Sequence, residues 1–171
     1  MYQLFLSIEN ASSRLVFQLD DVLNFVRSSP LDLEVHSLSD ILDSSLDDVV
    51  MPDQITIQRP TNDVELLCDA EKIKAVFTNL IVNSIQAMEN SGTITIQFDQ
   101  TSEDVTFSVQ DSGPGISSSA IEKIFEPLFT TKSRGTGLGL PAVKMIIQQH
   151  QGTISVSNNP TTFLIVLPKG S

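Results

Sequence analysis

Two clusters of glycines are the residues of this 171-residue chain whose type and spacing best suit ligand chemistry: Gly113 and Gly115, and Gly135, Gly137 and Gly139. Glycine allows positive φ angles and lets a ligand lie directly against the backbone. The second cluster ends where a helical pattern begins at Pro141. The free N–H groups and the dipole of a helix start suit a phosphate chain. The two clusters therefore indicate an anion site.

Three amide side chains precede the glycines on one predicted helix, residues 70–89. Asn79, Asn83 and Gln86 share a face of it, because they are four and three residues apart. Asparagine is unfavourable inside a helix, so a function for this face is plausible. An amide carbonyl can ligate Mg²⁺, which binds through few protein oxygens plus substrate phosphates. The alternative is an ordinary polar surface.

Asp111 and a long loop flank the same glycines. Asp111 follows a predicted strand, and its carboxylate can accept a hydrogen bond from an exocyclic amine while the glycines admit a flat ring. An Asx-type turn is the alternative. The loop Phe125–Gly135 suits a mobile lid whose Lys132 or Arg134 reaches a terminal phosphate. An ordinary surface loop, with its phenylalanines docked on the core, is the alternative there.

Composition narrows the class of partner. A net charge of −11 argues against nucleic acid or anionic membrane as partners. No run approaches the ~18 apolar residues of a membrane span, and the sequence shows no signal-peptide pattern. A single cysteine, Cys68, suits a reducing cytoplasm. We therefore expect a cytoplasmic domain, and because the helical pattern starts directly at Met1, a longer parent protein with a membrane anchor stays open.

Hydrophobic periodicity predicts a long helix and then a two-layer domain. Residues 2–27 carry a heptad-like seam that ends before Pro30 and needs a second helix, so a homodimer through residues 1–28 is possible. An acidic connector and a second helix are predicted between residues 32 and 50. Asp69 suits the N-cap of the helix 70–89, and His150 suits a cap or the surface at the end of a helix 141–150. Strands are predicted at 55–58, 65–68, 93–99, 105–110, 153–157 and 162–167.

These elements predict an α+β fold. Helices on one face of a mixed, mostly antiparallel sheet form a two-layer α/β sandwich. We assign this sandwich to residues 31–171 and the coiled-coil-like helix to residues 1–30. One domain with an appendage also agrees with the chain length.

Four segments carry a resemblance to a known family: NLIVNSIQAM (79–88), DSGPGI (111–116), FEPLFTTK (125–132) and GTGLGL (135–140). In order and spacing they resemble the N, G1, F and G2 boxes of sensor histidine kinases. NSIQAM with FEPLFTTK looks most like the nitrogen-regulation-type branch. The resemblance covers residues 32–169 and implies the Bergerat, or GHKL, ATP-binding sandwich that is shared with Hsp90-type chaperones, DNA gyrase and mismatch-repair ATPases.

The resemblance also implies roles for residues. Asn83 would ligate the Mg²⁺ that bridges the phosphates, with Asn79 supporting it, and Asp111 would bind the adenine amine. Lys132 would lie near the γ-phosphate in an ATP lid, Phe125–Arg134, which makes Asn79, Asn83 and Lys132 the catalytic residues. The remaining nucleotide-binding residues are implied to be Gly113, Gly115, Ile116 and Thr161 around the adenine, Phe125, Thr130 and Thr131 in the lid, and Gly135, Thr136, Gly137, Leu138, Gly139 and Leu140 around the phosphates.

By the same resemblance the chain binds Mg-ATP and transfers the γ-phosphoryl to a histidine on a dimerisation helix, the first step of two-component signalling. A response regulator receiver domain is then a further partner. Residues 1–30 resemble the second helix of the dimerisation hairpin. His36 follows Pro30 and His150 lies in the ATP domain, so neither occupies an acceptor helix. We therefore expect this chain alone not to phosphorylate itself.

The sequence departs from the pattern of this family at two positions, and two other functions stay open. Gln86 stands where many relatives have Lys or His, and Pro160 stands where Gly usually precedes Thr161, which weakens a water-mediated adenine contact there. An ATP-hydrolysing switch of the chaperone or gyrase kind would need a glutamate base four residues before Asn83. Asn79 has that position and is a poor base. A nucleotide-binding module that never transfers phosphate is the other alternative.

Overall fold

The computed structural model describes residues 30–132 and 135–170. The helical seam predicted for residues 2–27 lies outside them, and so does the surface of the possible homodimer. The elements in chain order are β1 (Glu34–Ser37), α2 (Leu38–Asp47), β2 (Gln54–Gln58), β3 (Glu65–Cys68), α3 (Ala70–Ala87), β4 (Ser91–Gln100), β5 (Asp104–Asp111), α4 (Ser118–Ile121), α5 (Gly139–Gln149), β6 (Thr153–Ser157) and β7 (Thr161–Pro168).

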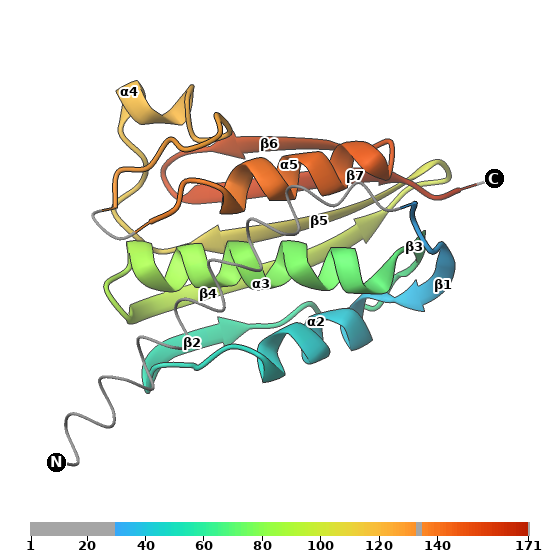
Figure 1. Cartoon of the computed structure of the whole chain (residues 1–171). Coiled ribbons are helices and arrows are strands. Elements are labelled where there is room, and N and C mark those ends of the chain that lie inside the picture. Colours follow the sequence, from blue (N-terminus) through green and yellow to red (C-terminus); the bar gives the residue numbers. More distant parts are fainter. Residues whose placement is uncertain (1–29, 133–134, 171) are drawn as a thin grey trace, which may run out of the picture.

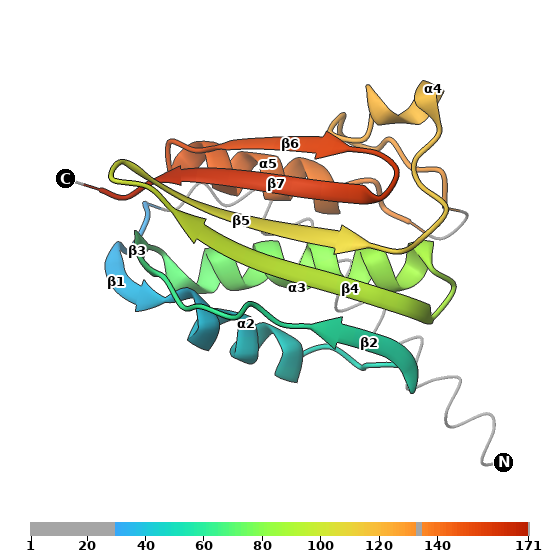
Figure 2. The same ribbon diagram turned by 180° about the vertical axis from the view of Figure 1, so that it is seen from behind.

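The main sheet has five strands in the order β2-β4-β5-β7-β6. Only β2 and β4 pair in parallel, and the other neighbours are antiparallel. A separate antiparallel pair joins β1 to β3. Helices α2, α3 and α5 lie on one face of the main sheet (Figure 1), and the view from behind shows the opposite face without helices (Figure 2). The predicted two-layer α/β sandwich with a mixed, mostly antiparallel sheet is confirmed.

The core lies between α3 and the central strands. Ile73, Phe77 and Leu80 of α3 are fully buried. The ring of Phe77 packs on that of Phe107 from β5, with ring centroids 4.7 Å apart. Residues of β5 alternate between buried and half-buried along the whole strand, as a strand with one face on a core must. Burial of these apolar side chains is the main stabilising contribution to the sandwich.

Several boundaries differ from the prediction, and three of the differences change an element or shift a helix end by two residues. Residues 34–37 form β1 rather than part of a connector, because β1 pairs with β3 in a register that joins Glu34 to Cys68. Helix α3 ends at Ala87, since Glu89 and Asn90 have positive φ angles of 53° and 68° and leave the helix. Helix α5 begins at Gly139 rather than at Pro141. Gly139, the last glycine of the second cluster, is therefore the first residue of α5.

His150 connects the end of α5 to the start of α3. The surface position considered for it is wrong, because the residue is buried. Nε2 accepts a hydrogen bond from the N–H of Asp69 at 3.1 Å, so Nδ1 carries the proton and donates to the carbonyl of Ile146 at 2.8 Å. Asp69 is the predicted N-cap of α3, and its side chain accepts from the N–H of Lys72. Helices α3 and α5 are thus joined at one end of the sandwich.

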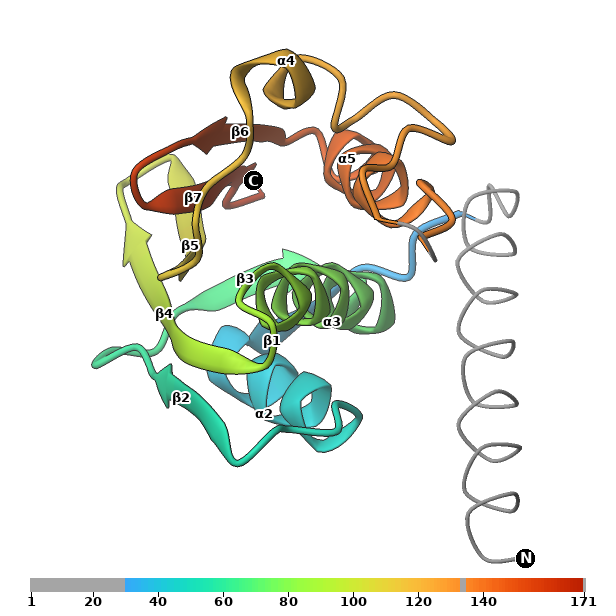
Figure 3. The same ribbon diagram turned by 90° about the vertical axis from the view of Figure 1, so that its left-hand side faces the viewer.

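The opposite end of the sandwich carries the glycine-rich segments. The C-terminal end of α3, the last residues of β5 and the start of α5 all lie at this end (Figure 1). The view along the helices shows α4 and the chain that follows it curving past the start of α5 (Figure 3). Among residues 30–132 and 135–170, no helix combines the length and the hydropathy that crossing a membrane requires.

Candidate functional site

Asp111 occupies the most enclosed position of the site. It is the last residue of β5, only 3% exposed, and pairs across the sheet with Thr161 of β7, which is equally buried. Its Oδ1 accepts a hydrogen bond from the N–H of Gly113 at 2.9 Å, so the Asx-type turn is real. Burial raises the pKa of the Asp111 carboxyl, and the Gly113 hydrogen bond opposes that shift. Within the described residues the second carboxylate oxygen makes no hydrogen bond, so it can accept one from a ligand.

The turn after Asp111 depends on close packing and on a residue that sequence reasoning missed. A Cβ at Gly113 would lie 2.7 Å from Oδ1 of Asp111, and Gly115 has a φ of +89°. The main chain of Ile116 is bound twice by Asn158: its N–H donates to Oδ1 at 2.9 Å, and its carbonyl accepts from Nδ2. Asn158 lies between β6 and β7, and an asparagine in a predicted turn gave no signal of this partner. It holds the glycine turn in place.

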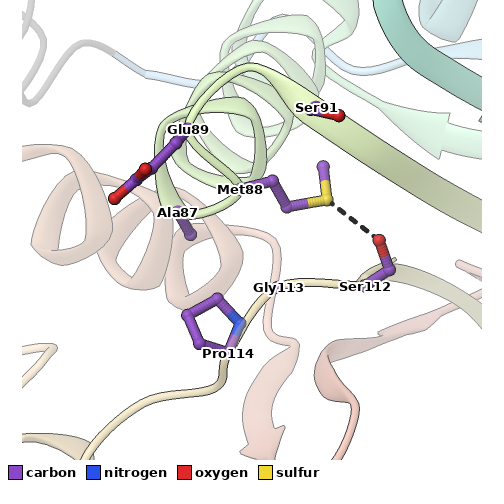
Figure 4. A pocket seen from close by; sticks show the side chains of 7 residues that line it. All are labelled: Ala87, Met88, Glu89, Ser91, Ser112, Gly113 and Pro114. Carbon is purple, nitrogen blue, oxygen red and sulfur yellow. Dashed lines mark hydrogen bonds between the residues drawn. The ribbon is translucent and has the colours of Figure 1, made fainter.

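A pocket of about 250 Å³ lies against the outside of this turn. Its lining comes from the end of α3, which includes Ala87 and Met88, and from the turn after β5, which includes Pro114 (Figure 4). The Ser112 hydroxyl donates to the sulfur of Met88 at 3.3 Å. The pocket therefore marks where the end of α3 supports the turn that carries Asp111. The residues that line it are Ala87, Met88, Glu89, Ser91, Ser112, Gly113 and Pro114.

The predicted amide face of α3 is confirmed as a single face directed at the glycine region. Asn79 and Asn83 are half-buried and Gln86 is exposed. Asn79 donates from Nδ2 to the carbonyl of Ala75 at 3.0 Å, and its Oδ1 lies against Gly139 at the start of α5. One turn further along, Oδ1 of Asn83 accepts a hydrogen bond at 2.8 Å from Lys132. The polar-surface alternative therefore does not describe Asn79 and Asn83.

Lys132 is held by two amide oxygens. Its Nζ donates to Asn83 Oδ1 and, at 2.7 Å, to Gln86 Oε1. Partial burial lowers the pKa of the Lys132 ammonium. Across the described part of the chain no group of three or more His, Cys, Asp or Glu could hold a metal. Asn83 Oδ1 already accepts a cation, and Mg²⁺ needs few protein oxygens when phosphates supply the others, so the donor set fits this ion.

The segment before Lys132 packs tightly on the second glycine cluster. The N–H of Leu128 donates to the carbonyl of Gly137 at 2.9 Å. Gly137 has a φ of +69°, and a Cβ there would lie 2.5 Å from the carbonyl carbon of Leu128. No other residue fits such a contact without a shift of the backbone. The loop and the start of α5 therefore form one surface.

The other predicted loop residues occupy distinct positions. The Lys132 N–H donates to Thr130 Oγ1 at 3.0 Å, and a Cβ at Gly135 would lie 2.6 Å from the same oxygen. Phe125 packs against the core and lies 5.5 Å from the Lys144 ammonium, which stacks over its ring. The phenylalanines are thus docked on the core, as the surface-loop alternative expected. Thr131 is exposed, and Arg134 lies outside the described residues. Thr136 Oγ1 accepts a hydrogen bond from the N–H of Leu138. Leu140 packs against the core.

The geometry brings together a buried carboxylate, two amide oxygens that bind a cation, and the start of an eleven-residue helix. A ligand with an amine-bearing flat base at one end and a phosphate chain at the other matches these groups in that order. The fold and the site therefore define a nucleotide-binding α/β sandwich.

Comparison with known proteins agrees with this class. Residues 68–171 match the family described as histidine kinase-, DNA gyrase B-, and HSP90-like ATPase, and the chain belongs to this family. The chain is 34% identical to sensor histidine kinase ZraS of Escherichia coli (strain K12) over 98% of its own length and 38% of that protein. The resemblance to the ATP-binding domain of sensor histidine kinases is thereby confirmed. The chain spans less than two fifths of the length of ZraS.

Solved structures show the same relationship. The catalytic domain of histidine kinase ThkA is 33% identical, with a TM-score of 0.73 over 81% of this chain and 96% of that one. A structure of ThkA in complex with response regulator protein TrrA is 29% identical, with a TM-score of 0.76 over 95% of this chain and 49% of the other. The sandwich described above is therefore that of histidine kinase catalytic domains.

Proposed function

We propose that this chain binds Mg²⁺-ATP and presents its γ-phosphoryl group to a histidine on a dimerisation helix, the first step of two-component signalling. The observation that carries the proposal is the order of groups along one end of the sandwich. The buried Asp111 carboxylate lies at one side. The Asn83 amide oxygen, which accepts from the Lys132 ammonium, lies on α3 one turn after Asn79, whose own oxygen contacts the start of α5. Membership of a family that includes histidine kinases supports it.

The adenine end of the proposed site is built around Asp111. Its second oxygen accepts a hydrogen bond from the exocyclic amine, while Gly113 and Gly115 let the ring approach the backbone. Ile116 supplies an apolar contact, and its position is held by Asn158. Thr161 lies opposite Asp111 in the sheet and faces the same region. Burial of the carboxylate strengthens this hydrogen bond because water competes less for it.

The phosphate end uses Asn83, Lys132 and the start of α5. Mg²⁺ held by Asn83, with Asn79 beside it, neutralises charge on the phosphate oxygens. The backbone N–H groups of Gly137 to Leu140 and the dipole of α5 bind the anionic chain. Lys132 supplies a positive charge for the terminal phosphate. Phosphoryl transfer depends mainly on such positioning and charge stabilisation, so no protein base is needed in this chain.

The partners follow from this role. The phosphoryl acceptor is a histidine on a dimerisation helix, paired with the helix that we assign to residues 1–30, which also forms the proposed homodimer. A response regulator receiver domain then takes the phosphoryl group, and the complex of ThkA with response regulator TrrA supports a partner of this kind. The domain is assigned to the cytoplasm, where ATP is supplied.

The ATP-hydrolysing switch is disfavoured by the contacts of Asn79. Its amide nitrogen is bound to Ala75 and its oxygen lies against Gly139. An amide is not a base at neutral pH, so it cannot activate an attacking water. The position that would hold a catalytic glutamate is therefore a packing contact.

The test supplies the complete dimerisation hairpin in trans together with ATP labelled at the γ-phosphate. We expect acid-labile, alkali-stable phosphate on the hairpin, and none on this chain alone. The Asp111→Ala variant serves as a control that should bind no nucleotide and transfer none. Labelled inorganic phosphate in place of labelled hairpin would contradict the kinase proposal and favour the hydrolytic switch.

A further inference from the structure

Gln86 has a contact that the proposed reaction does not use. Its Oε1 accepts from Lys132 Nζ at 2.7 Å, and the same ammonium donates to Asn83 Oδ1 at 2.8 Å. Gln86 lies three residues after Asn83, so both oxygens point from one face of α3 toward Lys132. The ammonium is therefore held between two amides.

This arrangement conflicts with metal binding at Asn83. A magnesium ion would lie about 2.0–2.1 Å from an oxygen ligand. An ammonium nitrogen 2.8 Å from the same oxygen would then lie less than about 5 Å from a dication. Two cations at that separation repel strongly. Lys132 and Mg²⁺ therefore compete for the oxygen of Asn83.

The hold on Lys132 is made by neutral groups alone. None of the ion pairs between residues of 30–132 and 135–170 includes Lys132. Neutral amide acceptors bind an ammonium less strongly than a phosphate does, since hydrogen bonds between two charged partners are about twice as strong. A bound phosphate chain can therefore draw Lys132 away from α3, and the same movement frees Asn83.

We propose that Gln86 is a positioning residue that keeps Lys132 against Asn83 until Mg²⁺-nucleotide binds, so that Lys132 and the metal ion alternate at the Asn83 oxygen. The inference has two halves, the contact between Gln86 and Lys132 and the competition of Lys132 with Mg²⁺. The second half rests on the proposed function. Its first half, the contact of Gln86 with Lys132, concerns the protein without nucleotide and can be measured by itself.

The first experiment measures trypsin cleavage after Lys132 in the nucleotide-free protein by mass spectrometry. Gln86→Met removes the acceptor but keeps the length of the side chain, and we expect cleavage about fivefold faster than in the wild type. Gln86→Glu restores an acceptor oxygen and should restore protection. Gln148→Met, at an exposed glutamine of α5, is the matched control and should leave the rate unchanged. Wild-type cleavage in Gln86→Met would overturn the inference.

The second experiment measures nucleotide affinity by calorimetry. Gln86→Met should bind ATP with Mg²⁺ about fivefold more tightly than the wild type, because Lys132 no longer competes. Adenosine, which lacks phosphates, should bind both proteins equally. Unchanged or weaker Mg²⁺-ATP binding in Gln86→Met would overturn the competition. If the wild type binds no nucleotide while the cleavage difference persists, the proposed function fails and the contact between Gln86 and Lys132 is upheld.

Discussion

Asn79 and Gly139 meet where α3 passes the start of α5: a Cβ at Gly139 would lie only 2.6 Å from Oδ1 of Asn79. The amide nitrogen of Asn79 is bound to the carbonyl of Ala75. The oxygen therefore cannot turn away from Gly139 without the loss of that bond. This contact sets how closely the amide face of α3 approaches the proposed phosphate site.

Gly139→Ala should damage both stability and nucleotide binding. The added methyl overpacks the contact between α3 and α5, which should lower the free energy of unfolding by about 1–3 kcal/mol. It also moves the N–H groups of α5, so we expect ATP binding to weaken about tenfold. Urea denaturation and calorimetry measure the two effects. Asn79→Ala in the same chain should relieve part of the stability loss. If the changes that the two single substitutions cause in the free energy of unfolding add up to that of the double variant within about 0.3–0.5 kcal/mol, a direct contact is contradicted.

Asp111→Asn should raise the stability of the fold while it weakens nucleotide binding. Burial raises the folded-state pKa of Asp111, so its ionised form disfavours folding, and this penalty grows as the pH rises through that pKa. An asparagine can keep the Gly113 hydrogen bond without a charge. The variant should therefore have a higher melting temperature than the wild type at pH 7, and the difference should vanish in acid, where the carboxyl is protonated in both states.

The same variant should lose adenine nucleotide affinity. With its oxygen bound to Gly113, the asparagine would present an NH₂ group to the adenine amine, and two donors would face each other. We expect ATP affinity to fall by about tenfold to a hundredfold in calorimetry. Asp99→Asn, at an exposed carboxylate of β4, is the control for loss of one charge and should change neither property. Undiminished ATP binding in Asp111→Asn would remove Asp111 from the adenine site.

Asn83→Ala should abolish the effect of magnesium on ATP affinity. The variant lacks the only oxygen that we assign to the metal, and it also loses one acceptor of Lys132. Calorimetric titrations with and without Mg²⁺ should then give the same ATP affinity, whereas the wild type should differ by about tenfold or more. Adenosine affinity should be preserved, which shows that the fold is intact. A wild-type response to Mg²⁺ would assign the metal to other groups.

His150→Ala should destabilise the end of the sandwich that is remote from the site. The change leaves the buried N–H of Asp69 without its acceptor, which costs about 1–3 kcal/mol. Urea denaturation followed by circular dichroism measures it. His36→Ala is the matched control, because His36 is half-exposed on β1 and should change the free energy of unfolding by no more than about 0.5 kcal/mol. Equal effects of the two changes would be inconsistent with the role of His150 as a link.

Two buried serines should respond in opposite directions. Ser84 in α3 is 2% exposed, and its hydroxyl has no hydrogen-bond partner in the described structure, whereas Ser45 in α2 is fully buried and donates to the carbonyl of Leu42 at 2.7 Å. Ser84→Ala should raise the free energy of unfolding by about 0.5–1 kcal/mol, because it removes an unpaired polar group from a helix. Ser45→Ala should lower it by a similar amount. Destabilisation by Ser84→Ala would reveal a partner for its hydroxyl.

Local chemistry made much of the site predictable. Asp69 caps α3 through its own sequence neighbours, the asparagines of α3 share a face because helical geometry requires it, and Asp111 bonds to Gly113 two residues away. Each of these contacts depends on residues close in the chain. Their chemical types alone therefore indicated an amine acceptor, a cation ligand and an anion-binding helix start.

Contacts between distant segments could not be read in the same way. Strand β1 has two exposed residues followed by two half-buried ones rather than an alternating pattern, and it exists because β3 provides a partner. Asn158 reaches Ile116, and His150 reaches Asp69, only once β5, β7 and the two long helices are packed. The sequence indicated only that Gln86 stands where many relatives have Lys or His. Nothing local indicated that Lys132 would lie against it. The packing of the sandwich creates these partners.

Strand β5 lies between β4 and β7, so the main chain at Asp111 is paired with Ile94 on one side and with Thr161 on the other. A position with a strand on each side opens to solvent less often than the edge of a sheet, and we expect its amide to exchange hydrogen slowly. The group that recognises the base is thus already ordered before a ligand arrives. Nucleosides therefore pay little conformational entropy at this end of the site.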